Sequence, residues 1–122
     1  MLLRRSLMAV GLLSLMTIAG CAGKKEIFYW GEYEGLVYDM YINPGSADTT
    51  TQISKLTTDI QKAEAKNMPI APGVHAHLGY MYALEGDIGQ AKAAFLTEKT
   101  LFPESASFID GMMSRIDGVK KQ

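Results

Sequence analysis

The stretch that decides the fold runs from Pro72 to Pro103 and reads PGVHAHLGYMYALEGDIGQAKAAFLTEKTLFP. Apolar side chains at steps of four, three and one, which is the spacing of one helix face, predict a helix that starts near Pro72 and runs to Glu85. Gly86 suits the left-handed residue that ends a helix, and Asp87 suits the cap of a second helix that ends before Pro103. The stretch therefore predicts a helical hairpin. Its apolar residues are Val74, Leu78, Met81 and Tyr82, then Ile88, Ala91, Ala94, Phe95, Leu101 and Phe102.

The spacing within this hairpin resembles one tetratricopeptide repeat, a helix–turn–helix unit of about 34 residues. Gly79 has no side chain, so the second helix can approach the first closely there. His75 departs from the repeat, which often has tryptophan there, and Glu98 stands where alanine is usual, which indicates a more open or polar face. An ordinary helical hairpin is the alternative. The agreeing residues are Leu78-Gly79, Tyr82, Gly86, Ala91, Phe95 and Pro103.

The N-terminus has the pattern of a secretory signal peptide. Arg4 and Arg5 precede an apolar run over 7–18, which is shorter than the roughly 18 residues of a membrane-spanning helix. The junction Ile18-Ala19-Gly20-Cys21 resembles the bacterial lipobox. That resemblance implies cleavage before Cys21 and attachment of diacylglycerol and an N-acyl chain to it. A plain signal peptide or a retained N-terminal anchor is the alternative.

The single cysteine and the residue after it bear on where the protein lies. Cys21 is the only cysteine, so no internal disulfide can form. Several acyl chains give stable membrane attachment, whereas one is marginal. Ala22 follows in place of aspartate, and resemblance to enteric lipoproteins then implies the outer membrane, on its periplasmic side. Without Arg4 and Arg5 the mature chain has a net charge of about −3 and no basic patch of the kind that binds nucleic acid.

Residues 26–42 hold six of the eleven aromatic side chains. Their spacing predicts a short helix over 33–42, which Asn43-Pro44-Gly45 ends. Two interpretations stay open. The aromatic side chains cover the open side of the repeat, because a repeat unit cannot bury its faces alone. Alternatively, Trp30 and Tyr33 anchor a partner protein.

Two further helices complete the predicted fold. Apolar residues from Ile53 to Ala63 predict a helix over about 50–66, with a solvated face of Gln, Lys, Thr, Asp and Glu. With helix 33–42 it would form a second, degenerate repeat. Ser105 is expected to cap a last helix with an apolar stripe at 108, 112 and 116. We therefore predict an all-α, tetratricopeptide-like fold of about five short helices, divided into a signal peptide (1–20), a lipidated tether with the aromatic segment (21–32), the helical domain (33–118) and a polar tail (119–122).

Three longer motifs extend beyond the repeat: Tyr29-Trp30-Gly31-x-Tyr33 with Tyr38-x-x-Tyr41 and Asn43-Pro44-Gly45, then Pro72-Gly73-x-His75-Ala76-His77-Leu78-Gly79, then Glu98-Lys99-x-Leu101-Phe102-Pro103-Glu104-Ser105. Together they resemble a family of short bacterial lipoproteins known only as a domain of unknown function. The resemblance covers nearly the whole mature chain. It implies neighbours that include a curli-secretion-channel-type lipoprotein and a second small lipoprotein, and hence a shared envelope complex. It implies no catalytic residue.

The sequence has no pattern of reactive chemistry. His75 and His77, the only histidines, point roughly 200° apart on a helix and cannot share a metal ion. The chain has neither a nucleophile elbow nor a Gly-rich phosphate loop, and no carboxylate pair stands in a cleft context. We therefore expect no enzyme, no catalytic residue, no metal site and no cofactor.

The functional hypothesis is a non-catalytic docking or accessory subunit that binds another envelope lipoprotein or a secretion component. Two alternatives are a regulator of a cell-wall synthase, for which a tether reaching about 35 Å is short, and a small ligand-binding domain, for which a helical array has little volume. Self-association is open as well, because short arrays can pair to bury their ends. The candidate partner contacts are Trp30, Tyr33, His75, Gly79, Tyr82 and Glu98.

Overall fold

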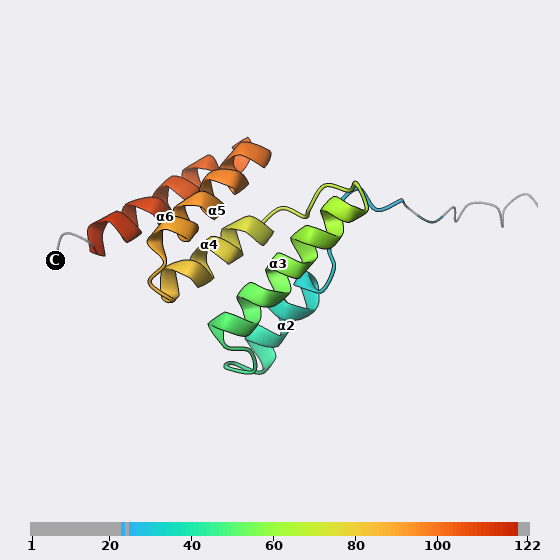
Figure 1. Cartoon of the computed structure of the whole chain (residues 1–122), viewed down its shortest axis with the longest axis horizontal. Helices are drawn as coiled ribbons and strands as arrows, with labels where there is room; N and C mark the ends of the chain where they lie inside the picture. Colours follow the sequence, from blue (N-terminus) through green and yellow to red (C-terminus); the bar gives the residue numbers. More distant parts are fainter. Residues whose placement is uncertain (1–22, 24, 120–122) are drawn as a thin grey trace, which may run out of the picture.

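The computed structural model describes residue 23 and residues 25–119 (Figure 1). The expected signal peptide, the lipidation site Cys21 and the last three residues of the predicted tail lie outside them. The described residues form five α-helices and no strand, which confirms the all-α prediction. Within the same residues, no helix is long and apolar enough to cross a membrane.

The helices form two antiparallel pairs followed by a last helix (Figure 1). The longer helix of the first pair packs on the first helix of the second pair, and this contact joins the two pairs. The last helix packs on the second helix of that pair. In chain order the elements are α2 (Tyr33–Ile42), α3 (Thr49–Ala65), α4 (Val74–Leu84), α5 (Ile88–Leu101), the 3-10 turn η2 (Pro103–Ser105) and α6 (Ala106–Val119).

The hairpin predicted from residues 72–103 is the pair α4 and α5. Gly86 ends α4 with φ +82°, and the Asp87 side chain accepts a hydrogen bond of 3.0 Å from the Gln90 N–H at the start of α5. A Cβ added to Gly79 would lie 2.8 Å from the Phe95 ring, so the close approach of the two helices is confirmed.

The start of α4 lies two residues after Pro72, near which the helix was predicted to begin. The helix begins at Val74, because Gly73 precedes it as the N-cap in a left-handed conformation with φ +94°. Few residues other than glycine adopt that conformation without strain. Pro72 therefore lies in the connector and is not the first helical residue.

Two clusters of buried side chains form the core. The larger lies between the two pairs and includes the predicted stripe of α4. The smaller lies between α5 and α6. The buried members are Leu36, Leu56, Ala63, Ile70, Ala71, Val74, Leu78, Met81 and Ala94 in the first, and Ala91, Phe95, Ile109 and Ile116 in the second.

The last helix corrects two expectations. Ser105 is not a cap: it ends the turn η2, which runs directly into α6, and its buried hydroxyl has no hydrogen-bond partner among the described residues. The helix also buries Ile109, next to the predicted stripe, and leaves Phe108 62% exposed. The stripe at 108, 112 and 116 is therefore rotated partly out of the core.

Each helical pair carries a buried carboxylate on its second helix that caps its first helix. Asp59 on α3 accepts a 2.9 Å hydrogen bond from the N–H of Glu32, the N-cap of α2. Glu98 on α5 accepts from the N–H groups of Gly73 (2.7 Å) and Ala76 (3.2 Å) at the start of α4. Both carboxylates satisfy helix N-terminal donors that have no partner within the helix.

Two residues correct the prediction of a solvated polar face on α3. Asp59 is only 2% exposed, and Gln52 on the same helix is also buried. The side-chain amide of Gln52 donates to the Ala47 carbonyl at 2.9 Å. These two residues therefore contribute to the inside of the domain, whereas most other polar side chains of α3, such as Gln61, Lys62 and Glu64, are exposed as predicted.

The aromatic segment before α2 is part of the folded domain. The Tyr29 N–H donates to the Pro69 carbonyl at 2.8 Å, and the Ala71 N–H donates to the Tyr29 carbonyl at 3.0 Å. The ring of Phe28 contacts the ring of Phe102 edge-on, with 5.9 Å between centroids. The segment therefore runs alongside the connector between α3 and α4. For Phe28 and Tyr29 this agrees with the interpretation that the aromatic side chains cover the repeat.

Candidate docking groove

A groove of about 810 Å³ opens between α2, α4 and α6. Figure 1 places α4 between the other two helices, so α4 forms the middle of the groove and the others form its sides. Most of the lining is apolar or aromatic, and among the described lining residues Arg115 alone carries a full charge. The lining residues are Tyr33, Val37, Met40 and Tyr41 from α2, Gly73, Ala76, His77 and Tyr80 from α4 and its N-cap, and Phe108, Met112, Arg115 and Ile116 from α6.

The contribution of α4 follows from helical spacing. Gly73, Ala76, His77 and Tyr80 recur at steps of three, one and three, which places them on one helix face. The face that carries Val74, Leu78 and Met81 is turned to the core. The first two groove residues are small, so the backbone of α4 lies near the bottom of the groove.

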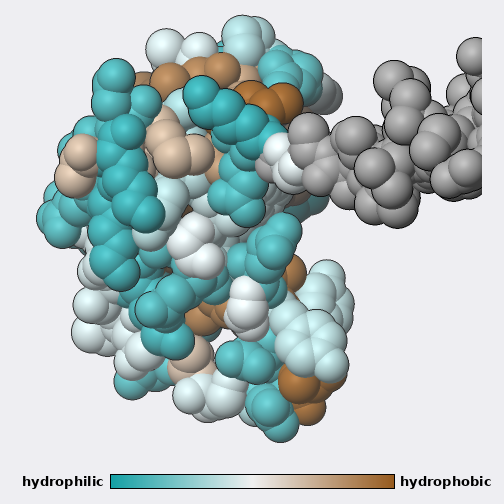
Figure 2. All heavy atoms as spheres, turned by 90° about the vertical axis from the view of Figure 1, so that its right-hand side faces the viewer, coloured by the Kyte–Doolittle hydropathy of each residue, from teal (hydrophilic) through white to brown (hydrophobic). Residues whose placement is uncertain are grey.

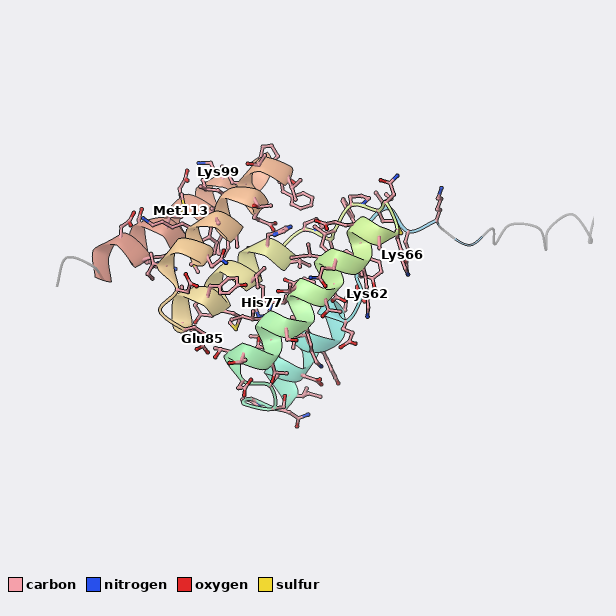
Figure 3. All side chains as sticks on the ribbon, viewed as in Figure 1. Lys62, Lys66, His77, Glu85, Lys99 and Met113 are labelled. Carbon is pink, nitrogen blue, oxygen red and sulfur yellow. The ribbon has the colours of Figure 1, made fainter. Side chains whose placement is uncertain are left out.

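His77 is held in place by the first helical pair. Its Nε2 lies 2.9 Å from Oε1 of Gln52 on α3, and the amide of Gln52 is oriented by its bond to the Ala47 carbonyl. An amide oxygen only accepts, so Nε2 of His77 is the donor. Figure 3 labels His77 on α4, on the side that faces α3. Burial lowers the pKa of His77, so the ring is neutral at pH 7.

Tyr33 joins the groove to the aromatic segment. Its ring stacks on Trp30, with 6.5 Å between centroids and 15° between planes, and meets the ring of His77 edge-on at 5.8 Å. Its hydroxyl lies next to Gly73, where an added Cβ would be 2.9 Å away. Burial raises the pKa of Tyr33, and the negative charge of Glu98 raises it further. The phenol therefore stays protonated and packed.

Residues 27–112 match the family described as a domain of unknown function, DUF4810. The chain belongs to this family. The match starts within the aromatic segment and ends inside α6, so it includes both helical pairs. The predicted resemblance to a family known only as a domain of unknown function is confirmed to that extent. Neither the curated proteins nor the solved structures gave a match to the chain.

Two of the predicted contact residues of the DUF4810 domain lie inside the fold, which corrects the prediction for them. Gly79 is buried against Phe95, so a partner cannot reach it. Glu98 is 2% exposed, and its two oxygens accept the N–H groups at the start of α4. The sequence indicated a more polar face at Glu98, whereas the carboxylate is there to cap a helix.

The other predicted contacts are half-buried and differ in position. Tyr33 lines the groove, whereas Trp30 stacks on Tyr33 and packs against the larger core cluster. Tyr82 packs against both core clusters. Burial lowers the pKa of His75, although Glu98 and Glu64 act to raise it, and His75 does not line the groove. Only one of the six predicted contacts therefore lines the groove.

Most groove residues of the DUF4810 domain were not among the predicted contacts. The predicted stripe of Phe108, Met112 and Ile116 is shared between the core and the groove. Ile116 is buried and Met112 packs on the smaller core cluster, whereas Phe108 is exposed. On α4 the groove is lined by a different face from the one that carries the core stripe. The apolar and aromatic side chains of this second face, such as Tyr80, are the sequence feature that could have indicated the groove.

The polar groups in and around the groove do not gather at one point. His77 is bonded to α3, and the guanidinium of Arg115 contacts the sulfur of Met112 at 3.6 Å. Within the described residues, no group of three or more His, Cys, Asp or Glu side chains is placed to hold a metal ion. The geometry of the groove is therefore that of an apolar binding surface with one cation at its side.

Proposed function

We propose that this DUF4810 domain is a non-catalytic docking module that binds an apolar segment of another envelope protein in the groove between α2, α4 and α6. The observation that carries the proposal is the groove itself. It is lined by three helices, its lining is mostly apolar or aromatic, and its volume is about 810 Å³. Exposed apolar grooves of this kind commonly receive a segment of a partner protein.

The proposal includes a tetratricopeptide-like arrangement. Two antiparallel helical pairs are followed by a single helix, and each pair has the same carboxylate cap from its second helix to its first. In repeat arrays the stacked pairs form a concave binding surface. The first helices of successive pairs would here be α2 and α4, followed by α6, and these three line the groove.

The proposal also places the domain at the periplasmic face of the outer membrane, held by lipid on Cys21. Its support is the signal-peptide pattern and the lipobox-like junction at residues 18–21. Six residues separate Cys21 from Phe28, where packing on the domain begins, and the seven steps between their Cα atoms reach about 25 Å when fully extended. Replacement of Cys21 by serine should abolish palmitate labelling and release the protein from the membrane fraction. Normal processing and membrane retention of that variant would contradict the anchor.

The docking function is tested with a photoreactive amino acid placed in the full chain in intact cells. Tyr80 and Phe108 are exposed positions in the groove, and Leu96 on α5 is an exposed apolar position outside it, which makes it the matched control. We expect illumination to yield an adduct with one different envelope protein from both groove positions and not from Leu96. Absence of such an adduct at both groove positions, or the same adducts from the control, would overturn the proposal.

A second candidate function is the binding of a small apolar molecule. The groove lies between the helix 33–42 and the hairpin, and its volume is within the range of about 300 to 1,000 Å³ typical of ligand sites. Few polar groups are available to orient a ligand, which favours a protein segment. If this second function holds, native mass spectrometry of the protein released from membranes should show an added mass that is lost on denaturation, unlike the covalent lipid on Cys21.

A further inference from the structure

We propose that, in copies whose groove holds no other protein, the groove receives α2 of a second copy, and that the two copies form a symmetric dimer. The inference rests on the proposed function, because it names an occupant of the same groove. Three observations carry it: the apolar surface that α2 exposes, the area of that surface, and the charges on α2 and in the groove.

The outer side of α2 is apolar and exposed. Tyr41 is 83% exposed, and Tyr38 and Ile42 on the same helix are also exposed. In Figure 2 the lobe at the lower right, where α2 lies, carries aromatic and apolar side chains on its surface. This surface continues across the groove to Tyr80 and Phe108. Monomeric soluble proteins rarely expose contiguous apolar patches above a few hundred Å².

The area of this surface matches what a dimer needs. Six large side chains contribute to it, with exposed fractions between 40% and 83%. At about 200 Å² for a whole side chain of this size, they expose roughly 700 Å² per copy. A stable interface buries about 800 Å² per partner. The six residues are Tyr38, Met40, Tyr41, Ile42, Tyr80 and Phe108.

The charges of the two surfaces are complementary. α2 contains Glu34 and Asp39 and no basic residue. At 100° per residue, Glu34 lies between Tyr41 and Tyr38 around the helix, on the exposed apolar side. Arg115 is the charged residue of the groove, and in the described part of the chain neither Arg115 nor Glu34 makes an ion pair. The exposed side of α2 is thus aromatic and acidic. The groove that would receive it is apolar and contains one cation, Arg115.

The arrangement closes on two copies. Both surfaces belong to every chain, so α2 of the first copy can lie against α6 of the second while α2 of the second lies against α6 of the first. Such a self-complementary contact has two-fold symmetry and leaves no free end that would recruit a third copy. Each dimer then contains two pairs of Glu34 with the Arg115 of the other copy.

The test uses the full chain in cells, with two differently tagged copies expressed together. Cys21 is the only native cysteine, so one copy carries Glu34→Cys and the other carries Arg115→Cys, and a short bis-maleimide is added. We expect a crosslinked product that contains both tags. The matched control pairs Glu34→Cys with Leu96→Cys, on an exposed helix position outside the groove, and should give no such product. Equal products from both pairs, or none from either, would overturn the inference.

A second measurement distinguishes the groove contact from chance proximity. Co-capture of the two tagged copies should fall at least tenfold with Tyr41→Ala, because buried tyrosines are frequent hot spots, and should not change with Leu96→Ala. Glu34→Arg and Arg115→Glu should each reduce it about fivefold, and the two changes combined in every copy should restore it. Failure of the combined variant to recover would contradict the pairing of these residues.

The two proposals can fail separately. If the groove positions capture a different envelope protein and no product with both tags forms, the dimer is wrong and the docking function stands. If the tagged copies crosslink and the groove positions capture only this chain, the dimer stands and docking of another protein is wrong.

Discussion

Replacement of Glu98 tests the central structural claim, which is that a buried carboxylate on α5 holds the start of α4. Its two oxygens accept the N–H of Gly73 at 2.7 Å and that of Ala76 at 3.2 Å, and the side chain is 2% exposed. Both N–H groups belong to the first turn of α4 or its cap, where no carbonyl within the helix is available. Gly73 has no side chain with which to cap its own helix.

The expected cost follows from what each substitution leaves behind. Glu98→Gln keeps one carbonyl oxygen, loses the charge that favours a helix N-terminus, and turns an NH₂ group toward the second donor. A lost charge-assisted bond and an unsatisfied buried N–H cost about 2 to 4 kcal/mol together. Glu98→Ala leaves both donors unpaired and a cavity, at about 3 to 5 kcal/mol. Small domains are stable by about 5 to 15 kcal/mol, so the alanine variant should be close to unfolding.

The measurement is urea unfolding at pH 7, followed by far-ultraviolet circular dichroism, on the mature chain with Cys21→Ser. Glu26→Gln is the matched control, since Glu26 is exposed and precedes the first described helix, and it should stay within about 0.5 kcal/mol of the parent. The reasoning would be refuted if Glu98→Gln were as stable as the parent or more so. The cost of burying a charge would then exceed what the two hydrogen bonds return.

Three further changes test other contacts. Gly79→Ala would place a Cβ 2.8 Å from the Phe95 ring and should lower the free energy of unfolding by about 1 to 3 kcal/mol; an unchanged urea midpoint would contradict the close helix contact. Asp59→Asn weakens the bond to the Glu32 N–H, but burial raises the pKa of Asp59, so we expect a loss of only about 1 kcal/mol; faster amide exchange at Glu32 would locate it, and unchanged exchange would argue against the cap. Burial lowers the pKa of His77 below its ordinary 6.5, so the unfolded chain binds more protons and stability falls as the pH drops through that value. His77→Gln should flatten this loss between about pH 7.5 and about pH 5.5, and an equal slope would show that His77 does not cause it.

The hairpin of α4 and α5 was predictable because its signals are local. Gly86 and Asp87 act on residues next to them in the chain, and the spacing of the apolar residues of α4 fixes one face of that helix. The close contact at Gly79 was predictable as well, since only the absence of a side chain lets two helix backbones approach there. Such features need no knowledge of how the pairs are packed.

The two buried carboxylates were not predictable in the same way. Glu98 lies 25 residues from Gly73, and Asp59 lies 27 residues from Glu32. A charged side chain on a helix is normally exposed to solvent unless a distant part of the chain packs over it and donates hydrogen bonds to it. The sequence does not show which backbone N–H groups do so. The groove was missed for a related reason. On α6 the residues 108, 109, 112, 113 and 116 offer two adjacent stripes, and packing on α5 selects the one that contains Ile109.

The buried caps and the groove meet at Gly73. Its N–H donates to the carboxylate of Glu98. Its Cα, which carries no side chain, lies against the hydroxyl of Tyr33 on α2. The carboxylate on α5 therefore fixes both the start of α4 and the place where the wall formed by α2 meets it. Elsewhere along the groove, Tyr41 on α2 and Phe108 on α6 are exposed. A groove that is fixed at Gly73 and has exposed aromatic side chains along its sides can accept apolar segments that differ in detail, and this is the property that a docking surface requires.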